Sequence, residues 1–197
     1  MSRHFFALFS RMKHLDRWAL MRNTRPEPLS DHALEVAAIA HCLAEIGNRR
    51  LGRRYDPGRA ALLGMYHDMP EILTGDLPTP VKYMNPEIRS AYASIEQTAK
   101  RALLDTLPGD LVPAFRPLLD PAPETPEAPL VKAADKISAL IKCVEERNAG
   151  NREFSAAESA TRAALEALAC PEAEIFLSEF MESYSLVLDS VLTDEAE

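Results

Sequence analysis

The sequence lacks an apolar run long enough to cross a membrane. A transmembrane helix needs about 18 or more consecutive apolar residues, and none of the apolar stretches reaches this length. The N-terminal residues also lack the continuous apolar segment of a secretory signal. We therefore expect a protein that is neither secreted nor associated with a membrane.

Cysteine and glycine are scarce. The chain has 3 cysteines, an odd and low count, and Cys42 and Cys143 fall in helical patterns where small core residues are expected. Such cysteine usage fits a reducing compartment, so we predict a cytoplasmic protein. The 7 glycines contrast with 15 prolines, which cluster between apolar periodic segments and therefore mark helix ends.

Positive charge is in short supply, because the formal net charge is -8. This balance argues against general binding of a nucleic-acid polymer. The first 25 residues are the exception, since their arginines and lysine face a single acid, Asp16. An Arg-rich start can mimic a transit peptide, but the Phe and Leu residues here are spaced as in a helix docked on the core. A local positive segment in an acidic chain suits a small anionic ligand.

Sustained alternation of apolar and polar residues is absent. Apolar residues recur at spacings of three and four, and 47% of the chain is hydrophobic, which predicts an all-α helical bundle formed by one compact domain, residues 1–197. The predicted helices cover about 4–16, 30–46, 57–67, 86–107, 126–149, 153–169 and 172–192. Ser30 and Asp56 are predicted N-caps. A break near Asp68-Met69, after which Pro70 starts a short new turn, a rigid loop at 75–80 and a Pro-rich connector at 121–129 separate the helices.

Two histidines and two aspartates stand beside the apolar stripes of these helices: His32, His67, Asp68 and Asp135. Two imidazoles and two carboxylates can hold one divalent transition metal and leave positions open for water and substrate. Each residue has an alternative explanation on its own. A histidine on an apolar face is more often a core residue than a ligand, and Asp135 could pair with Lys132 or Lys136. The four together favour a metal site, because an uncompensated buried carboxylate is costly.

Further residues are candidates for binding or acting on a ligand. Glu71 comes three residues after Asp68, which can bring its carboxylate near a metal-bound water, although an acid behind Pro70 also suits a helix start. Arg17 could clamp a phosphate and Trp18 could cover a base or sugar. Their alternatives are a solvated arginine and a core tryptophan. Asp76 could be a simple turn residue.

The motifs around these positions resemble a known family. The spaced His32, His67-Asp68 and Asp135 resemble the HD-domain metal-dependent phosphohydrolases. The segments 16–23 (DRWALMRN), 71–83 (EILTGDLPTPVKY) and 130–135 (LVKAAD) are similar to the bacterial 5′-deoxynucleotidases of that superfamily. The similarity covers nearly the whole chain and is weakest after residue 155.

The resemblance implies an activity and an assembly. Members of the family are compact helical homodimers that hydrolyse deoxyribonucleoside 5′-monophosphates to deoxynucleoside and phosphate. They use one divalent transition metal, for which Co, Mn, Cu, Zn, Fe and Ni remain open here. The alternatives are an HD phosphohydrolase acting on an alarmone or a cyclic nucleotide, and a protein that binds metal or nucleotide without turnover. Glu71 and Arg17 argue against the non-catalytic alternative.

The resemblance also implies residue roles. The metal ligands would be His32, His67, Asp68 and Asp135, and all of these except His67 would also contact the substrate. Glu71 corresponds to the residue that activates the attacking water, Arg17 to the arginine that orients the phosphate, and Trp18 to the residue packed against the sugar. The substrate-binding loop would be Asp76, Leu77, Pro78 and Thr79. Met69-Pro70 departs from the family pattern, and Pro70 could displace Glu71.

Overall fold

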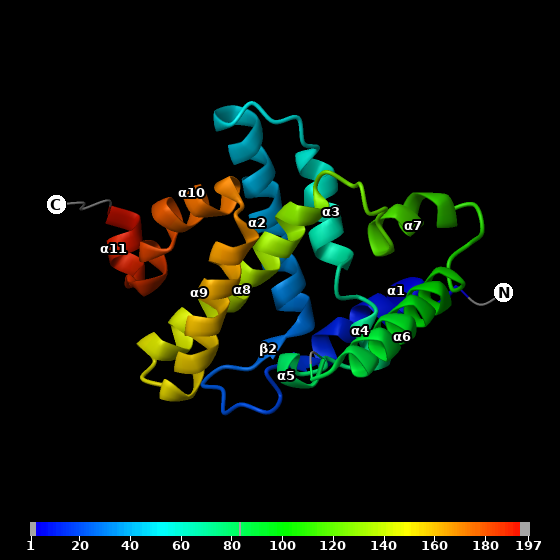
Figure 1. Ribbon diagram of the computed structural model, residues 1–197, viewed down its shortest axis with the longest axis horizontal. Coiled ribbons are helices and arrows are strands. Elements are labelled where there is room, and N and C mark those ends of the chain that lie inside the picture. Colours follow the sequence, from blue (N-terminus) through cyan, green and yellow to red (C-terminus); the bar gives the residue numbers. More distant parts are fainter. Residues whose placement is uncertain (1–2, 83, 194–197) are drawn as a thin grey trace.

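The computed structural model describes residues 3–82 and 84–193, and almost all of its regular structure is helical (Figure 1). Its α-helices are α1 (Phe5–Phe9), α2 (Leu29–Arg50), α3 (Pro57–Tyr66), α4 (Glu71–Thr74), α5 (Thr79–Lys82), α6 (Pro86–Leu104), α7 (Val112–Leu119), α8 (Ala128–Asn148), α9 (Ser155–Leu168), α10 (Pro171–Phe180) and α11 (Leu188–Thr193). Short 3-10 helices are η1 (Ser10–His14), η2 (Arg152–Phe154) and η3 (Glu182–Ser185). The all-α prediction is therefore confirmed.

One small ladder departs from that prediction. Strands β1 (Asp16–Arg17) and β2 (Glu27–Pro28) pair antiparallel. Two-residue strands are too short to leave an alternating pattern in the sequence, so periodicity could not predict them. The ladder also explains why Ser30 is not the N-cap of α2. That helix begins at Leu29, whose backbone N–H donates to the Leu15 carbonyl at 2.7 Å.

The main core forms where α2, α3 and α8 pack together, with α9 and α10 against them (Figure 1). Its fully buried side chains include Val36, Leu43, Ile137 and Leu140. These residues recur at helical spacing on α2 and α8, so each helix turns one apolar face inward. The two long helices thereby become the rigid centre of the molecule.

A glycine allows α3 to approach α2 closely. A Cβ added at Gly64 would lie 2.9 Å from the Ala37 Cα and 3.0 Å from its backbone nitrogen. Contacts this short leave no room for a side chain. The close approach brings the end of α3 beside the first turn of α2, where His67 and His32 have ring centroids 5.3 Å apart.

A second apolar cluster joins the N-terminal segment to α6 and α7. Phe5 and Met12 are both 1% exposed, and the Phe5 ring lies edge-on to Phe115 at a centroid distance of 5.2 Å. The N-terminal segment is thus docked on the core, as predicted. It is not the single helix expected over 4–16, because α1 gives way to the tighter η1 after Phe9.

The remaining predicted helix boundaries are confirmed in some places and wrong in others, and the local sequence explains which. Asp56 caps α3 as predicted, accepting a hydrogen bond from the Arg59 backbone N–H at 3.0 Å. Helix α7 was not predicted, since it contains Pro117 in its interior and another proline in its first turn. The last predicted helix, over 172–192, divides into α10, η3 and α11. Helix α5 occupies part of the segment predicted as a rigid loop.

Within residues 3–82 and 84–193, no helix combines the length and the apolar character that crossing a membrane requires.

Candidate metal and nucleotide site

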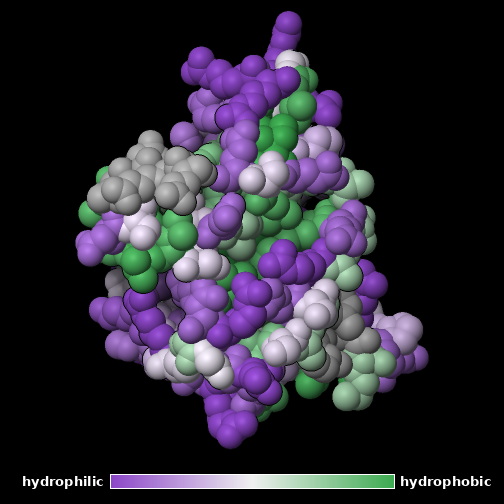
Figure 2. Space-filling model, turned by 90° about the vertical axis from the view of Figure 1, so that its left-hand side faces the viewer, coloured by the Kyte–Doolittle hydropathy of each residue, from purple (hydrophilic) through white to green (hydrophobic). Residues whose placement is uncertain are grey.

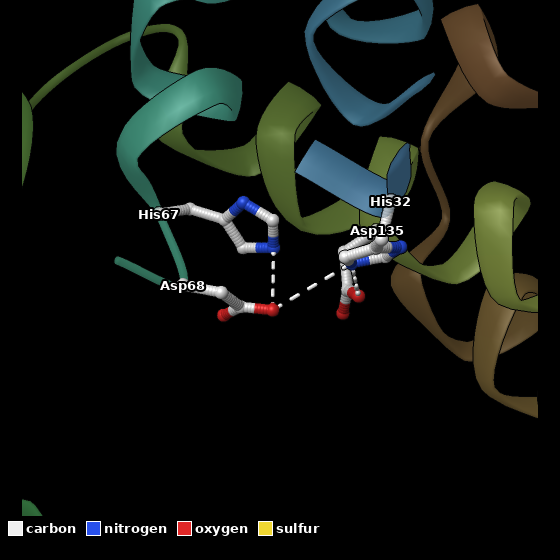
Figure 3. A group of neighbouring side chains, drawn as sticks. All are labelled: His32, His67, Asp68 and Asp135. Carbon is white, nitrogen blue, oxygen red and sulfur yellow. Dashed lines mark ion pairs between the residues drawn. The ribbon is translucent and has the colours of Figure 1, made fainter. Parts of the chain in front are cut away.

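The four candidate metal ligands meet at one point, although they come from three parts of the chain (Figure 3). His32 lies in the first turn of α2, His67 and Asp68 follow α3, and Asp135 lies on α8. One donor atom from each residue lies within 4.8 Å of the others. His67 Nε2 is 3.0 Å from Asp68 Oδ2, and His32 Nε2 is 3.3 Å from Asp135 Oδ1. The structure therefore brings together the set proposed from sequence.

In each imidazole, Nδ1 points away from the other ligands and contacts a polar partner. His67 Nδ1 lies 2.7 Å from the Gly64 carbonyl oxygen, so it donates there and leaves a lone pair on Nε2. His32 Nδ1 lies 2.9 Å from Ser138 Oγ, and Ser138 donates in turn to Glu35 Oε2 at 2.5 Å. A serine that gives its proton to Glu35 can only accept from His32, which again leaves the lone pair on Nε2.

Both inner nitrogens, His32 Nε2 and His67 Nε2, are buried and lack a hydrogen-bond partner among the described residues. Unpaired buried polar atoms are costly and rare. Arg17 Nη1 lies 2.5 Å from His32 Nδ1 and favours the tautomer with the proton on Nε2. A bound metal would select the tautomer with the proton on Nδ1, because it needs the Nε2 lone pair. Two imidazoles and two carboxylates with this geometry fit one divalent transition metal.

The two aspartates concentrate negative charge at this point. Burial opposes ionisation of Asp68, but His67 and His32 hold the pKa of its carboxyl well below the usual range. Burial likewise opposes ionisation of Asp135, whose pKa is nevertheless lowered, chiefly by the neighbouring His32. Both carboxylates are therefore ionised at neutral pH and attract a cation. Asp135 also forms the ion pair with Lys136 that was its alternative explanation, at 2.9 Å.

Arg17 lies against this cluster. Its Nη1 donates to Glu27 Oε1 at 2.8 Å, and its Nη2 lies 3.8 Å from Asp135 Oδ1. The side chain is only 12% exposed, so the alternative of a solvated arginine is wrong. Trp18 follows with φ 59, a left-handed conformation that is rare for a bulky residue. Its Nε1 donates to Glu27 Oε2 at 2.6 Å.

Glu27, Ser138 and Glu35 were missed by the sequence analysis. Glu27 could have been noticed as an acid beside the basic N-terminal segment, flanked by Pro26 and Pro28. Ser138 sits on the buried face of α8, three residues after Asp135, where a hydroxyl needs a partner. Glu35 follows His32 by three residues on α2, but only the tertiary fold shows that Ser138 connects the two.

Glu71 follows Pro70 directly and is the first residue of α4. Pro70 forms the N-cap of α4, and the Glu71 backbone N–H donates to the Asp68 carbonyl at 2.9 Å. The Glu71 side chain is buried, and its Oε2 has no partner within the described part of the chain. Burial, and after it the charges of Asp68 and Asp76, raise the pKa of the Glu71 carboxyl to about 9. Glu71 therefore lies beside the aspartates and also occupies the helix start.

The predicted substrate loop borders the same site. Asp76 is partly buried, and burial raises the pKa of its carboxyl against the opposing effects of Arg17 and a hydrogen bond with the Trp18 backbone. Leu77 and Pro78 are likewise partly buried. Thr79 begins α5, but its side chain lies outside the described residues. The loop thus runs next to Arg17 and Trp18.

Comparison with known proteins agrees with this geometry. Residues 4–184 match the model of a family described as 5′-deoxynucleotidase YfbR-like. The protein named 5′-deoxynucleotidase YfbR from Escherichia coli O1:K1 is 48% identical over 192 residues, which are 97% of this chain and 96% of that protein.

Two solved structures have a similar fold. An HD-domain phosphohydrolase from Listeria innocua matches with a TM-score of 0.81 and 23% identity, covering 93% of this chain and 90% of its own. The PH0347 protein from Pyrococcus horikoshii OT3 matches with a TM-score of 0.69 and 24% identity, covering 92% and 97% of the two chains. With its fold and sequence both matched over nearly their whole length, the chain belongs to the YfbR-like family of 5′-deoxynucleotidases.

Proposed function

We propose that the protein hydrolyses deoxyribonucleoside 5′-monophosphates to deoxynucleoside and phosphate. The observation that carries the proposal is the placement of Arg17 beside the cluster of two histidines and two aspartates, with the Trp18 ring centroid 5.9 Å from the Arg17 guanidinium carbon. A phosphate bound at this cluster would have the Arg17 guanidinium at one side. The Trp18 ring would lie next to that guanidinium. Membership of the family and 48% identity to a protein named 5′-deoxynucleotidase support the substrate class.

The metal ligands in this proposal are His32, His67, Asp68 and Asp135. When bound, a divalent metal polarises a phosphoryl oxygen and lowers the pKa of water from 15.7 towards about 7. Mixed nitrogen and oxygen donors suit Mn, Fe, Co, Ni, Cu or Zn, and cellular availability often decides among them.

Glu71 is the proposed general base. Burial, and after it the charges of Asp68 and Asp76, raise the pKa of Glu71. A cation held by the four ligands would oppose this shift and favour the ionised carboxylate. Glu71 takes a proton from the water that attacks phosphorus. As the bond from phosphorus to the 5′-oxygen breaks, the proton that Glu71 removed from water is returned to that oxygen, directly or through solvent. The oxygen leaves as the deoxynucleoside alcohol, and Glu71 is again a carboxylate.

Arg17 is the proposed phosphate-orienting residue. Its Nη1 is bound to Glu27, while Nη2 faces the cluster at 3.8 Å from Asp135 Oδ1 and is the edge placed to meet a phosphate oxygen. A guanidinium neutralises phosphate charge and fixes its direction at once. His32, Asp68 and Asp135 would also contact the substrate phosphate. Trp18 and the Asp76 loop, with Leu77, Pro78 and Thr79, would enclose the sugar and base.

The proposal extends to a homodimer in the cytoplasm. The C-terminal elements expose several large apolar side chains, including Val187 at 69%, Leu188 at 71% and Leu192 at 73% (Figure 2 shows the face that carries α11). Exposed apolar groups of this kind are typical of protein contacts. Cys42, Cys143 and Cys170 are all free thiols, which suits a reducing compartment.

Phosphate release tests the function. The purified protein is incubated with deoxy- and ribonucleoside 5′-monophosphates, a cyclic nucleotide and a guanosine alarmone, with each candidate metal and with a chelator. We expect metal-dependent release from the deoxynucleotides in preference to the other substrates. Turnover of only the cyclic nucleotide or the alarmone would contradict the proposed substrate class, and binding without any turnover would contradict catalysis.

A further inference from the structure

A single carboxylate joins the two residues that the proposed function places on the substrate. Arg17 and Glu27 are directly paired in the β1–β2 ladder. Glu27 Oε1 accepts from Arg17 Nη1 at 2.8 Å, and Glu27 Oε2 accepts from Trp18 Nε1 at 2.6 Å. The side chains of Arg17 and Glu27 are each only 12% exposed. Oε1 also lies 3.4 Å from His32 Nδ1. Both carboxylate oxygens are thus occupied, Oε2 by Trp18 and Oε1 by Arg17 with His32 nearby, in a place where water competes little.

The direction of the Trp18 ring depends on such contacts. Its φ of 59 lies in the region that favours glycine. The Trp18 carbonyl accepts from the Met21 backbone N–H at 2.9 Å and from Asn23 Nδ2 at 3.2 Å, which holds the turn but not the ring. The ring also packs against Phe154, with centroids 5.3 Å apart, but that apolar contact does not fix the position of Nε1. The hydrogen bond to Glu27 supplies the missing direction.

We infer that Glu27 is a positioning residue that aligns the phosphate-binding edge of Arg17 with the sugar-contacting ring of Trp18. This inference rests on the proposed function. The bond from Arg17 Nη1 to Glu27 leaves Nη2 turned to the four candidate metal ligands. The bond from Trp18 Nε1 to Glu27 sets the distance from the ring to those ligands. A sugar with an added 2′-hydroxyl would then meet a ring that cannot move aside. Phosphate alignment and sugar selection are therefore coupled through one side chain.

Only a glutamate meets both demands. Glutamine has a single carbonyl oxygen, so it can accept strongly from one partner while its amide N–H₂ faces the other donor. Aspartate is shorter by one methylene and cannot span both partners from the β2 backbone. Glu27→Gln therefore changes the hydrogen bonding while preserving the size of the side chain.

The first test uses kinetics. We expect Glu27→Gln to lower the ratio of kcat/KM for dAMP to kcat/KM for AMP by about tenfold, the effect of one lost charge-assisted hydrogen bond. The metal content should stay at the wild-type value, because Ser138 still holds His32 Nδ1 at 2.9 Å when the nearby Glu27 charge is removed. A loss of metal in Glu27→Gln would assign the effect to His32 and overturn the inference. A purely structural role would reduce both substrates equally and leave the ratio unchanged. An unchanged ratio in a folded variant overturns the inference.

A matched control is Glu153 on η2, which pairs with a residue of the loop that follows Trp18. Glu153 accepts from the Arg22 side chain at 2.6 Å, and Arg22 is 92% exposed. Glu153→Gln makes the same chemical change to another ion pair of the 18–26 segment. It should leave the dAMP to AMP ratio at the wild-type value. An equal loss of selectivity in this control would assign the effect to general loosening of the segment and overturn the specific role of Glu27.

A double variant tests whether Glu27 changes the dAMP to AMP ratio through Trp18. Trp18→Phe keeps an aromatic ring but removes Nε1–H. If Glu27 acts on sugar selection through that donor, Glu27→Gln adds no further change in the ratio to a Trp18→Phe background. A further drop of full size in the double variant would show that Glu27 does not act through Trp18.

Intrinsic fluorescence tests the contact without turnover. The chain has 1 tryptophan, so the emission reports on Trp18 alone. We expect Glu27→Gln to shift the emission and to increase acrylamide quenching before any substrate is added, with circular dichroism unchanged. Unchanged emission and quenching overturn the inference directly. If the wild type hydrolyses no deoxynucleotide, the proposed function fails, while this measurement still decides whether Glu27 holds the ring.

Discussion

At the scale of single residues, the candidate ligands are held in place by side chains outside the ligand set. His32 lies on α2 and is oriented by Ser138 on α8, which is in turn bound to Glu35 back on α2. A histidine ligand commonly donates its second N–H in this way, which fixes both tautomer and ring direction. The buried hydroxyl therefore matters for metal affinity, although it carries no charge.

The first prediction concerns this hydroxyl. Ser138→Ala should raise the metal dissociation constant about 10–100-fold, because such partners orient the ligand and increase its basicity. Competition with a chelator measures the constant. Ser159→Ala serves as the control, since the Ser159 hydroxyl only donates to the Ser155 carbonyl of its own helix. Equal metal affinity in wild type and Ser138→Ala would mean that the imidazole is oriented by Arg17 instead.

The second prediction concerns Glu71. Glu71→Gln should lower kcat by about 10²–10⁴-fold, the usual contribution of a general base, while KM and metal content change little. Steady-state kinetics and metal analysis measure these quantities. Glu96→Gln is a matched control, because Glu96 pairs with Lys82 at 2.9 Å and has no proposed role in the reaction. A kcat close to wild type would leave Glu71 with its helix-start role alone.

At the scale of elements, α8 secures the loop that carries Trp18. Glu146 on this helix is 1% exposed and accepts from Lys142 at 2.5 Å. It also accepts from the Thr24 backbone N–H at 3.0 Å and from Asn151 Nδ2 at 2.8 Å. One buried carboxylate thus ties the 18–25 segment to both α8 and the turn that follows it.

The third prediction follows from the Glu146 pKa. Burial opposes ionisation, but the hydrogen bonds from Lys142, Asn151 and Thr24 lower the pKa to about 2. Because the folded-state pKa is depressed, the stabilisation is present above the unfolded value and is lost as pH falls through the folded value. Glu146→Gln should lower the free energy of unfolding at pH 7 by about 3 kcal/mol, since it removes one partner of a buried ion pair.

The pH dependence distinguishes this cause from a packing defect. The difference between wild type and Glu146→Gln should shrink between about pH 5 and pH 2, as protons bind the unfolded carboxylate first. Urea unfolding across this range measures it. Glu145→Gln, one residue away on the exposed side of α8, should show no comparable difference. A constant difference at all pH values would indicate lost packing rather than lost charge.

The same scale shows which features could be predicted from sequence. The helices with clear apolar periodicity were predicted, and so were His32, His67, Asp68 and Asp135, because each interrupts or borders an apolar stripe. Helix α7 was missed because Pro117 within it is a strong signal against a helix. Glu27 was missed because its partners lie across a ladder of two-residue strands. Local patterns carry no information about such tertiary pairings.

At the scale of the whole molecule, the candidate ligands connect the central elements. His32 is on α2, His67 and Asp68 directly follow α3, and Asp135 is on α8, so a metal bound there would link three parts of the main core. The same point gathers buried carboxylates in a protein whose formal net charge is already -8. A cation would offset this concentration of negative charge, and its removal should weaken the fold as well as the activity.

The last prediction is that metal binding raises the Tm of the protein. The ligands come from distant parts of the sequence, so the unfolded chain cannot hold the metal with the same affinity. A metal at 100 times its dissociation constant would add about 2.7 kcal/mol to the free energy of unfolding. For a chain of this size, about 2–4 °C of Tm corresponds to each kcal/mol, which gives a rise of about 5–10 °C.

Thermal unfolding with metal and with excess chelator measures this rise. Asp135→Ala should show no metal-dependent rise, because it removes one ligand from α8. Asp110→Ala, an exposed aspartate outside the site, should keep the full effect. A wild-type Tm that is the same with metal and with chelator would show that the four side chains do not bind metal in the folded protein, even though they converge. A rise that persists in Asp135→Ala would instead place the bound ion elsewhere.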